Sequence, residues 1–198
     1  MSSYQKATFL LSVANLTQLP PDEGTEIAFI GRSNAGKSSV INTLTHNKNL
    51  ARVSKTPGRT QFINLFTLDK TKRLADLPGY GYARVPAEVR EQWTDRMEAY
   101  FQERECLKGL ILVMDIRHPL QEFDQNILEG SSQCELPVHI LLNKADKLTP
   151  NQIRQTEQLV KKGLEPYGKL VSFQTFSALK KDGVKKLEHV LDQWFSIK

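Results

Sequence analysis

One short segment near the start of the chain constrains its fold more than any other feature of the sequence. It matches the pattern G-x-x-x-x-G-K-[ST] in full, and its residues are Gly31, Arg32, Ser33, Asn34, Ala35, Gly36, Lys37 and Ser38. An apolar run at 27–30 precedes it, and a segment of helical period at 37–45 follows. A glycine-rich turn between a buried strand and a helix N-terminus can wrap its backbone around a phosphate group. The segment therefore predicts a phosphate-binding loop, and each of its residues is a candidate contact to a nucleotide.

Strand-like and helix-like segments alternate along the rest of the chain. Apolar runs predict further strands at 62–68, 73–76, 110–115, 138–143 and 170–176. Helical periodicity is found at 86–105, around 120–128, after Pro150 and at 184–195. Such alternation is typical of an α/β fold, with a mostly parallel sheet of about six strands and helices on both faces. Ligands of such sheets bind beyond the carboxyl ends of the strands.

Composition limits the class of protein without choosing its partner. The length of 198 residues predicts a single domain, with the core motifs at 26–178 and a short N-terminal extension at 1–24. The net charge of +5 excludes a strongly acidic, disordered chain and leaves open an attraction to anions such as RNA. Because the sequence has no membrane-length apolar run, no secretory signal and no heptad pattern, we expect a cytoplasmic monomer.

Three segments supply candidate ligands for the phosphates and for Mg²⁺. We expect Lys37 to bind the β and γ phosphates and to act in catalysis, and the Ser38 hydroxyl to ligate Mg²⁺. We expect Asp76 to hold Mg²⁺ through a water and the Gly79 N–H to bond the γ-phosphate, in the segment Asp76, Leu77, Pro78 and Gly79. The loop between these segments needs a threonine for Mg²⁺ and catalysis, and Thr60 is our choice, with Thr56 as the alternative. Nucleotide contacts expected from this loop are Gly58, Arg59, Thr60, Gln61 and Phe62.

Two segments after later strands predict which base is bound. The first reads Asn143, Lys144, Ala145 and Asp146. An aspartate at this place can accept hydrogen bonds from N1–H and the 2-amino group of guanine, a donor pair that adenine lacks. Each polar group left unpaired costs roughly 1–3 kcal/mol, which is enough for discrimination between bases. We expect Lys144 to lie along the base and Asn143 to tie this segment to the phosphate loop. The second segment, Phe176, Ser177 and Ala178, is similar to one whose backbone contacts guanine O6.

Together these segments resemble the five G motifs of the TRAFAC-type GTPases, in the same order and over most of the chain. More specifically, residues 31–39, 55–61, 76–83 and 115–120 resemble the EngB family. The resemblance implies a Ras-like P-loop GTPase domain that binds GTP or GDP with Mg²⁺. It also implies a bacterial switch in the assembly of the large (50S) ribosomal subunit, with that subunit or its precursor as partner and a link to normal cell division and septation.

The residue after Gly79 raises the question of how GTP would be hydrolysed. Small signalling GTPases place a glutamine there to orient the attacking water, and this chain has Tyr80. Tyrosine cannot do that job, so we assign no catalytic base and expect slow hydrolysis. Two candidates could accelerate hydrolysis: the ribosomal precursor, or a monovalent cation bound beside the phosphates. Potassium-dependent relatives hold K⁺ with an asparagine of the phosphate loop, and Asn34 occupies the matching place.

Two rival functions remain open at this stage. In the first, the nucleotide gates a binding module and hydrolysis is dispensable. In the second, the GTPase serves membrane trafficking or metal-ion transport, a role that the missing lipid-attachment motif and membrane span weaken. The lysines at 180, 181, 185 and 186 could contact RNA phosphates or simply form a solvated basic face.

Overall fold

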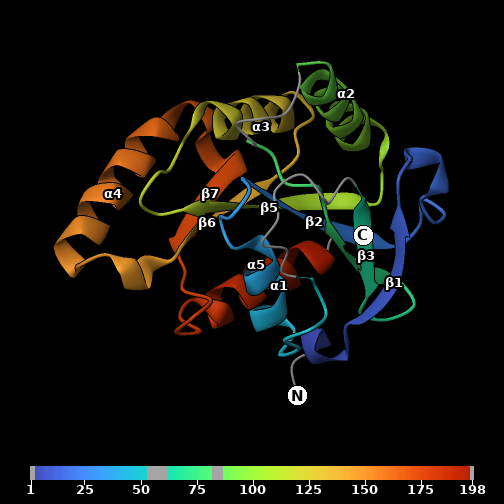
Figure 1. Cartoon of the computed structure of the whole chain (residues 1–198), viewed down its shortest axis with the longest axis horizontal. Helices are drawn as coiled ribbons and strands as arrows, with labels where there is room; N and C mark the ends of the chain where they lie inside the picture. The colour runs from blue at the N-terminus through green and yellow to red at the C-terminus, as the bar shows by residue number, and fades with distance from the viewer. Residues whose placement is uncertain (1–2, 53–61, 82–86, 197–198) are drawn as a thin grey trace.

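The structure is a computed structural model that describes residues 3–52, 62–81 and 87–196. Within them, one sheet of seven strands forms the middle of the molecule (Figure 1). In their order across the sheet, the strands are β1 (Thr8–Val13), β3 (Ile63–Thr67), β4 (Lys72–Asp76), β2 (Thr25–Gly31), β5 (Leu107–Asp115), β6 (Val138–Asn143) and β7 (Val171–Thr175). The strands from β4 to β7 in this order are parallel, whereas β3 runs antiparallel to β4 and β1. The carboxyl ends of the five parallel strands therefore meet at one end of the sheet.

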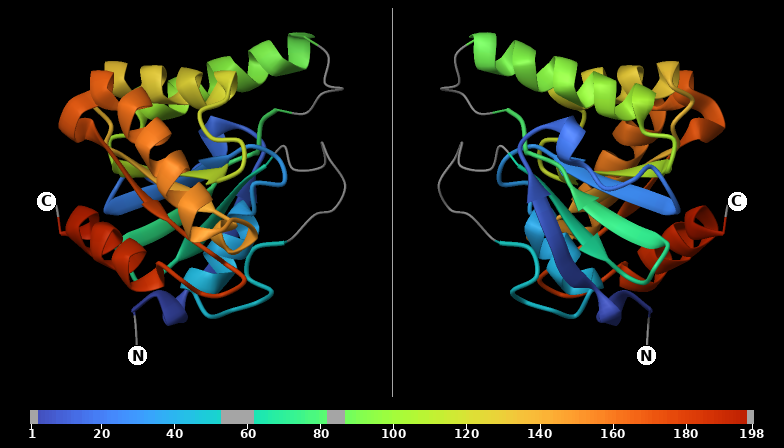
Figure 2. Two further views of the ribbon diagram at one scale, coloured as in Figure 1. Left: turned by 90° about the vertical axis from the view of Figure 1, so that its left-hand side faces the viewer. Right: turned by 90° about the vertical axis from the view of Figure 1, so that its right-hand side faces the viewer.

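Helices cover both faces of this sheet, as Figures 1 and 2 show. One face carries α2 (Ala87–Glu103), α3 (Glu122–Gln133) and α4 (Pro150–Gly163), and the other carries α1 (Lys37–Leu44) and α5 (Val184–Phe195). The short 3-10 helices are η1 (Ser3–Lys6), η2 (Leu16–Gln18), η3 (Ala145–Lys147) and η4 (Glu165–Leu170). The sequence correctly predicts this Ras-like arrangement. None of the helices in the described residues has the length and apolar character needed to cross a membrane.

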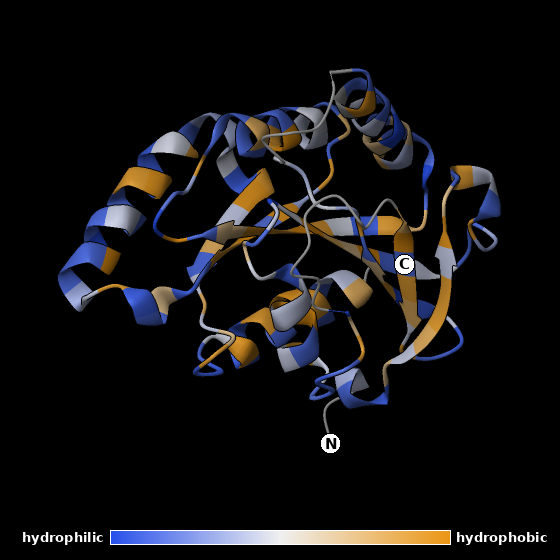
Figure 3. Cartoon of the chain, viewed as in Figure 1, coloured by the Kyte–Doolittle hydropathy of each residue, from blue (hydrophilic) through white to orange (hydrophobic). Residues whose placement is uncertain are grey.

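The central strands supply side chains to two separate hydrophobic cores. In β2, Ala28 and Ile30 join the core under α2, α3 and α4, whereas Ile27 and Phe29 join the core under α1 and α5. All four side chains are fully buried. Successive residues of a strand point to opposite faces, so a strand covered on both sides reads as a continuous apolar run. The hydropathy colours of Figure 3 show this in the middle of the sheet.

The sheet has one strand more than the sequence predicts. The additional strand, β1, lies in the N-terminal extension and pairs with β3 at the edge of the sheet. Phe9 and Leu10 in it are 57% and 41% exposed, and only Val13 is buried. The segment nevertheless carries an apolar run, Phe9, Leu10 and Leu11 followed by Val13, so the sequence held a strand signal that our prediction did not use.

A buried ion cluster joins the strands at their amino ends, away from the end where the predicted site residues lie. Glu26, at the start of β2, is fully buried and accepts hydrogen bonds from Arg73 Nε at 3.1 Å and Arg104 Nη2 at 3.2 Å. Tyr100 on α2 also donates its hydroxyl to Glu26. Burial and the Glu26 carboxylate raise the pKa of Tyr100 well above its usual value, so this phenol stays a donor. The negative charge of Glu26 thus balances the positive charges of two arginines in the interior.

Replacing Glu26 should therefore cost much of the stability of the fold. Removing one partner of a buried ion pair typically costs about 3–5 kcal/mol, because the remaining charge is left uncompensated. We expect Glu26→Ala to lower the free energy of unfolding by about this amount in a urea titration. Glu103→Ala, at the exposed last turn of α2, is the matched control, with an expected change within about 0.5 kcal/mol. Equal unfolding midpoints for both variants would contradict the structural role of Glu26.

Candidate functional site

The glycine-rich segment at 31–38 forms the loop between β2 and α1 that the sequence predicts. β2 ends at Gly31, and α1 begins at Lys37, so Lys37 and Ser38 lie in the first helical turn. Gly36 has a left-handed φ of 95°, and a Cβ there would lie 2.4 Å from Asn143 Nδ2. Both the backbone conformation and the available space therefore require glycine at this position. The N–H groups of the first helical turn have no partner within the helix, which makes this end of α1 suitable for an anion.

Lys37 and Asp76, which two separate motifs predict, form an ion pair. Lys37 Nζ contacts Asp76 Oδ1, and the two side chains are 11% and 6% exposed. Asp76 is the last residue of β4, and the register between β4 and β2 places it opposite Phe29. This register brings the end of β4 beside the phosphate loop. The lysine expected to bind phosphate and the carboxylate expected to hold Mg²⁺ are thus neighbours.

The oxygen donors around this ion pair fit Mg²⁺. This ion prefers oxygen ligands and is usually held by one or two protein side chains together with phosphate and water oxygens. Asp76 supplies a buried carboxylate, and Ser38 supplies a hydroxyl from the residue next to Lys37. The third predicted ligand, Thr60, lies outside the described residues. So do its alternative Thr56 and the predicted contacts Gly58, Arg59 and Gln61.

Asn143, at the end of β6, joins three segments that the sequence identifies separately. It is 2% exposed, and its Nδ2 donates to the Ala35 carbonyl of the phosphate loop at 2.8 Å. Its Oδ1 accepts the backbone N–H of Ala178 at 3.2 Å. A single amide therefore fixes the phosphate loop to the segment 143–146 and to the segment 176–183. We call the segment 143–146 the first base loop and the segment 176–183 the second base loop.

Lys144 of the first base loop is held by two contacts, and the sequence analysis identifies neither. Its Nζ donates to the Asn34 carbonyl at 2.6 Å and pairs with Asp115 Oδ2 at 2.9 Å. Asp115 ends β5 and also accepts two side-chain hydrogen bonds from Arg117, at 2.9 and 2.6 Å. Burial of Asp115 opposes ionisation, but the hydrogen bonds from Arg117 and Lys144 outweigh it and hold its pKa well below the usual range. Asp115 is therefore ionised, and its ion pair with Lys144 helps to hold the Lys144 side chain against the phosphate loop.

Asp146 links the two base loops. Its Oδ1 accepts the hydroxyl of Ser177 at 2.5 Å, and the neighbouring Ala145 N–H donates to the Phe176 carbonyl at 3.1 Å. Ser177 and Asp182 exchange two backbone hydrogen bonds of 3.1 Å, which close the second base loop. The carboxylate expected to recognise guanine is thus oriented by the segment expected to contact guanine O6.

The described site residues gather at the carboxyl ends of β2, β4, β6 and β7. Leu77, Pro78 and Phe176 are buried, whereas Gly79, Ala145 and Ala178 are half-buried beside the polar groups described above. Arg32 and Asn34 are exposed on the phosphate loop. Phe62 lies immediately before β3 and is 46% exposed.

Comparison with known proteins assigns the chain to a family. The sequence model of a family described as "50S ribosome-binding GTPase" matches residues 26–144. The chain is also 52% identical to a probable GTP-binding protein EngB of Coxiella burnetii, over 98% of this chain and 95% of that protein. The chain belongs to the EngB family. A second EngB-family protein, from Mannheimia succiniciproducens, is 52% identical over 98% of this chain and 95% of its own length. This EngB-family chain is accordingly a GTPase.

Solved structures share the fold of this EngB-family chain at low sequence identity. A crystal structure of a probable GTP-binding protein EngB is similar with a TM-score of 0.70 and 24% identity, over 86% of this chain and 98% of that one. Era in complex with MgGDPNP and a segment of 16S ribosomal RNA is similar with a TM-score of 0.66 and 19% identity, over 87% of this chain and 57% of that one. These two likenesses establish the Ras-like GTPase fold.

Tyr80, the residue in place of the usual glutamine, has its side chain buried in the core under α2 and α3. It is 3% exposed, packs against the rings of Phe123 and Trp93, and donates its hydroxyl to Asp124 on α3. Burial and the Asp124 carboxylate raise the pKa of Tyr80 well above its usual value, so the phenol stays protonated. A buried, protonated phenol that donates to Asp124 cannot orient a water at a phosphate.

The segment 78–80 is anchored on both sides. The Ser33 N–H donates to the Tyr80 carbonyl at 2.8 Å, which joins it to the phosphate loop. Trp93 on α2 donates its indole N–H to the Pro78 carbonyl at 3.3 Å. Asp124 was not predicted as a partner, although a carboxylate three residues before Ile127 and four before Leu128 falls on the apolar face of its helix. That position was the available signal.

Proposed function

We propose that this EngB-family GTPase is a GTP-dependent switch in the assembly of the large ribosomal subunit. The observation that carries the proposal is the meeting of four side chains at one end of the sheet: Lys37, Asp76, Asn143 and Asp146. The first two suit phosphate and Mg²⁺, Asp146 suits the polar edge of guanine, and Asn143 ties the loop that carries Asp146 to the phosphate loop. The matching family is described as a 50S ribosome-binding GTPase, which supports the large subunit or its precursor as the proposed partner. The proposal includes a cytoplasmic monomer of one domain and a link to cell division and septation.

Each side chain has a stated task in this proposal. Lys37 binds the β and γ phosphates, and its ion pair with Asp76 keeps cationic and anionic partners for Mg·GTP side by side. Ser38 and Thr60 would hold Mg²⁺ directly, and Asp76 would hold it through a water. When bound, the ion neutralises charge that develops on the phosphate oxygens. Asp146 accepts N1–H and the 2-amino group of guanine, while Lys144 lies along the base.

The conformation of the segment 78–80 would depend on whether the γ-phosphate is present. In the proposal, the Gly79 N–H bonds this phosphate, and loss of the phosphate releases the loop. The next residue, Tyr80, is tied to Asp124 on α3, and Trp93 on α2 is tied to Pro78. A change at Gly79 would therefore act directly on α2 and α3, two of the three helices described on that face. We infer that this face distinguishes the GTP state from the GDP state for the ribosomal partner.

Hydrolysis should be slow without help, and potassium is the helper that is simplest to test. Asn34 lies exposed on the phosphate loop with a φ of 65°, and its carbonyl is occupied by Lys144, so its side-chain oxygen is the group proposed for K⁺. We expect hydrolysis at least about tenfold faster in potassium than in sodium, a difference of about 1.4 kcal/mol in the barrier. The measurement is phosphate release at matched ionic strength. Equal rates in the two salts would remove K⁺ from the proposal and leave the ribosomal particle as the helper.

Replacement of the gene by a Lys37→Ala or Ser38→Asn variant tests the cellular role. We expect both variants to accumulate large-subunit precursors in sucrose gradients, because neither holds Mg·GTP correctly. Lys162→Ala, at the exposed last turn of α4, is the matched control and should give a normal profile. A normal profile in the Lys37 and Ser38 variants would show that assembly needs neither tightly bound Mg·GTP nor its hydrolysis, which contradicts the proposed switch.

A further inference from the structure

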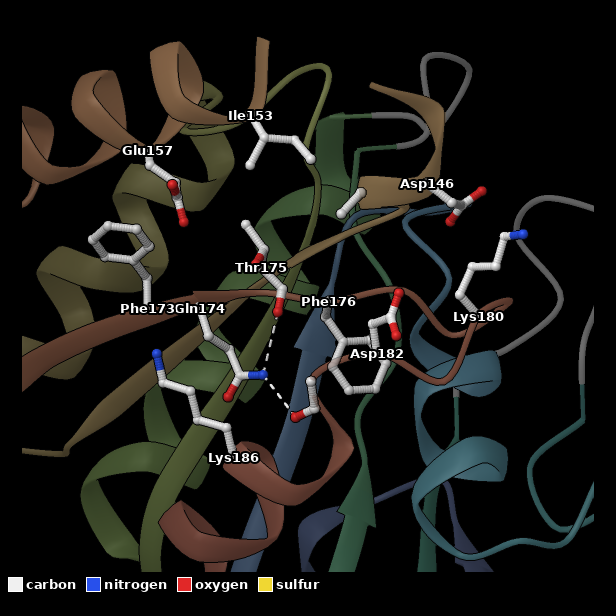
Figure 4. Close-up of a pocket in the computed structure, with 12 residues that line it drawn as sticks. Asp146, Ile153, Glu157, Phe173, Gln174, Thr175, Phe176, Lys180, Asp182 and Lys186 are labelled. Atoms are coloured by element: carbon white, nitrogen blue, oxygen red, sulfur yellow. Dashed lines mark hydrogen bonds between the residues drawn. The ribbon is translucent and has the colours of Figure 1, made fainter. Parts of the chain in front are cut away.

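Behind the base loops lies a hollow of about 660 Å³ between α4, β7 and α5 (Figure 4). Asp146 lies at its upper end, and Gln174 and Gly183 form part of its wall. The second base loop therefore has open space on this side instead of a continuous packed core. A loop that lacks close packing needs another support to keep a fixed geometry.

A chain of buried polar side chains provides this support. Gln174 is 3% exposed, and its Nε2 donates to the carbonyls of Gly183 at 2.8 Å and Thr175 at 3.3 Å, the dashed lines of Figure 4. Its Oε1 lies 3.0 Å from Nε2 of His139, which is 1% exposed. Because Gln174 Nε2 serves the carbonyls, Oε1 must accept, so the proton of His139 is on Nε2. His139 Nδ1 then accepts the Ser172 hydroxyl at 2.8 Å.

His139 acts in this hydrogen-bonded network as a neutral imidazole. Burial and the charge of Lys186 lower its pKa to about 4, against the smaller opposing effect of the Gln174 hydrogen bond. Every nitrogen and oxygen along the line from Ser172 through His139 and Gln174 to Gly183 therefore has a partner. A satisfied buried network of this kind rigidifies what it contacts.

Three further steps lead from Gly183 to Asp146. Gly183 has a left-handed φ of 86° at the start of α5, and the preceding Asp182 pairs with Ser177 through two backbone hydrogen bonds. Ser177 donates its hydroxyl to Asp146. A Cβ at Gly183 would lie 2.6 Å from Gln174 Nε2, which shows how closely the two residues approach. A displacement of Gly183 would be transmitted along this path to Asp146.

We infer that Gln174 is a positioning residue for guanine recognition: through Gly183 and Ser177 it fixes the orientation of the Asp146 carboxylate. The inference rests on the proposed role of Asp146 as the group that recognises guanine. Gln174 itself touches no nucleotide in this account. Its contribution is to base selectivity, over and above any contribution to stability.

The test compares the affinities of GDP and IDP, because IDP lacks the 2-amino group that Asp146 would bind. Gln174→Met keeps the length of the side chain and removes its hydrogen bonds. We expect the preference for GDP over IDP to fall about tenfold, since a hydrogen bond to a charged group is lost or misdirected. A merely structural role would change the melting temperature and leave the ratio of the two affinities as in the unaltered protein.

Two further variants keep the test decisive if Gln174→Met is unstable. Gly183→Ala disturbs the same contact from the other side, because of its φ and the close approach of Gln174, and should lower the same ratio. Ser172→Ala removes only the outer end of the polar chain and should leave the ratio unchanged. A ratio unchanged in both Gln174→Met and Gly183→Ala, or equal losses of GDP and IDP affinity, would overturn the inference.

Asp146→Ala separates this inference from the proposed function. If it abolishes the preference for GDP over IDP while Gln174→Met retains it, only the role of Gln174 fails. If Asp146→Ala itself retains the preference, the proposed recognition of guanine fails and the inference fails with it.

Discussion

Lys37→Ala is expected to weaken GTP binding by about a hundredfold or more. Hydrogen bonds that involve a charged group contribute roughly 1.5–3 kcal/mol each, and Lys37 would make them to two phosphates. The loss also leaves the buried Asp76 carboxylate without its ion-pair partner, so that a negative charge faces the phosphates directly. Titration with a fluorescent GTP analogue measures the effect, with circular dichroism to confirm folding.

A second lysine controls for the change of net charge in this experiment. Lys162 lies exposed at the other end of the sheet, on the last turn of α4, and Lys162→Ala removes the same charge. Its dissociation constant for GTP should match that of the unaltered protein. If Lys37→Ala and Lys162→Ala bind GTP equally well, the segment 31–38 is not the phosphate-binding loop.

Asp146→Asn is expected to change the preferred base from guanine to xanthine. The carboxylate can accept both N1–H and the 2-amino group of guanine, whereas an asparagine can accept only one of them with its oxygen. Xanthine carries a carbonyl oxygen at position 2, to which the asparagine amide can donate. With one bond lost and one donor facing another donor, GDP affinity should fall about a hundredfold, or about 2.7 kcal/mol.

The measurement is competition of GDP and XDP against a fluorescent nucleotide. Asp182→Asn makes the same chemical change at an exposed residue of the second base loop and should keep the preference for GDP. A variant Asp146→Asn that still prefers GDP would show that guanine is recognised by other groups.

The sequence predicts the parts of this protein that depend on local pattern. Buried strands read as apolar runs, and the phosphate loop combines glycines with a lysine and a serine at fixed spacing. The candidate nucleotide-binding residues of the first base loop directly follow such a run; they are Asn143, Lys144 and Asp146. Since parallel strands bring their carboxyl ends together, these local patterns were enough to place the described residues at one site.

The sequence predicted one long-range contact, from Asn143 to the phosphate loop, but it did not predict two other long-range pairs. Asp115 pairs with Lys144, which is 29 positions away in the sequence, and Tyr80 donates to Asp124, which is 44 positions away. These pairs depend on strand order and helix placement, which no spacing in the sequence encodes. The edge strand β1 was missed although Phe9, Leu10, Leu11 and Val13 are a local strand signal, because no recognised motif adjoins it.

Co-sedimentation with ribosomal particles tests the central claim most directly. The protein would be mixed with large subunits, with their precursors and with small subunits, in the presence of GDP, GTP or a non-hydrolysable GTP analogue. We expect binding to the large subunit or its precursor with the analogue, release with GDP, and no binding to the small subunit. Failure to bind either large-subunit particle in any nucleotide state would contradict the ribosomal role, although the guanine-nucleotide site could still stand.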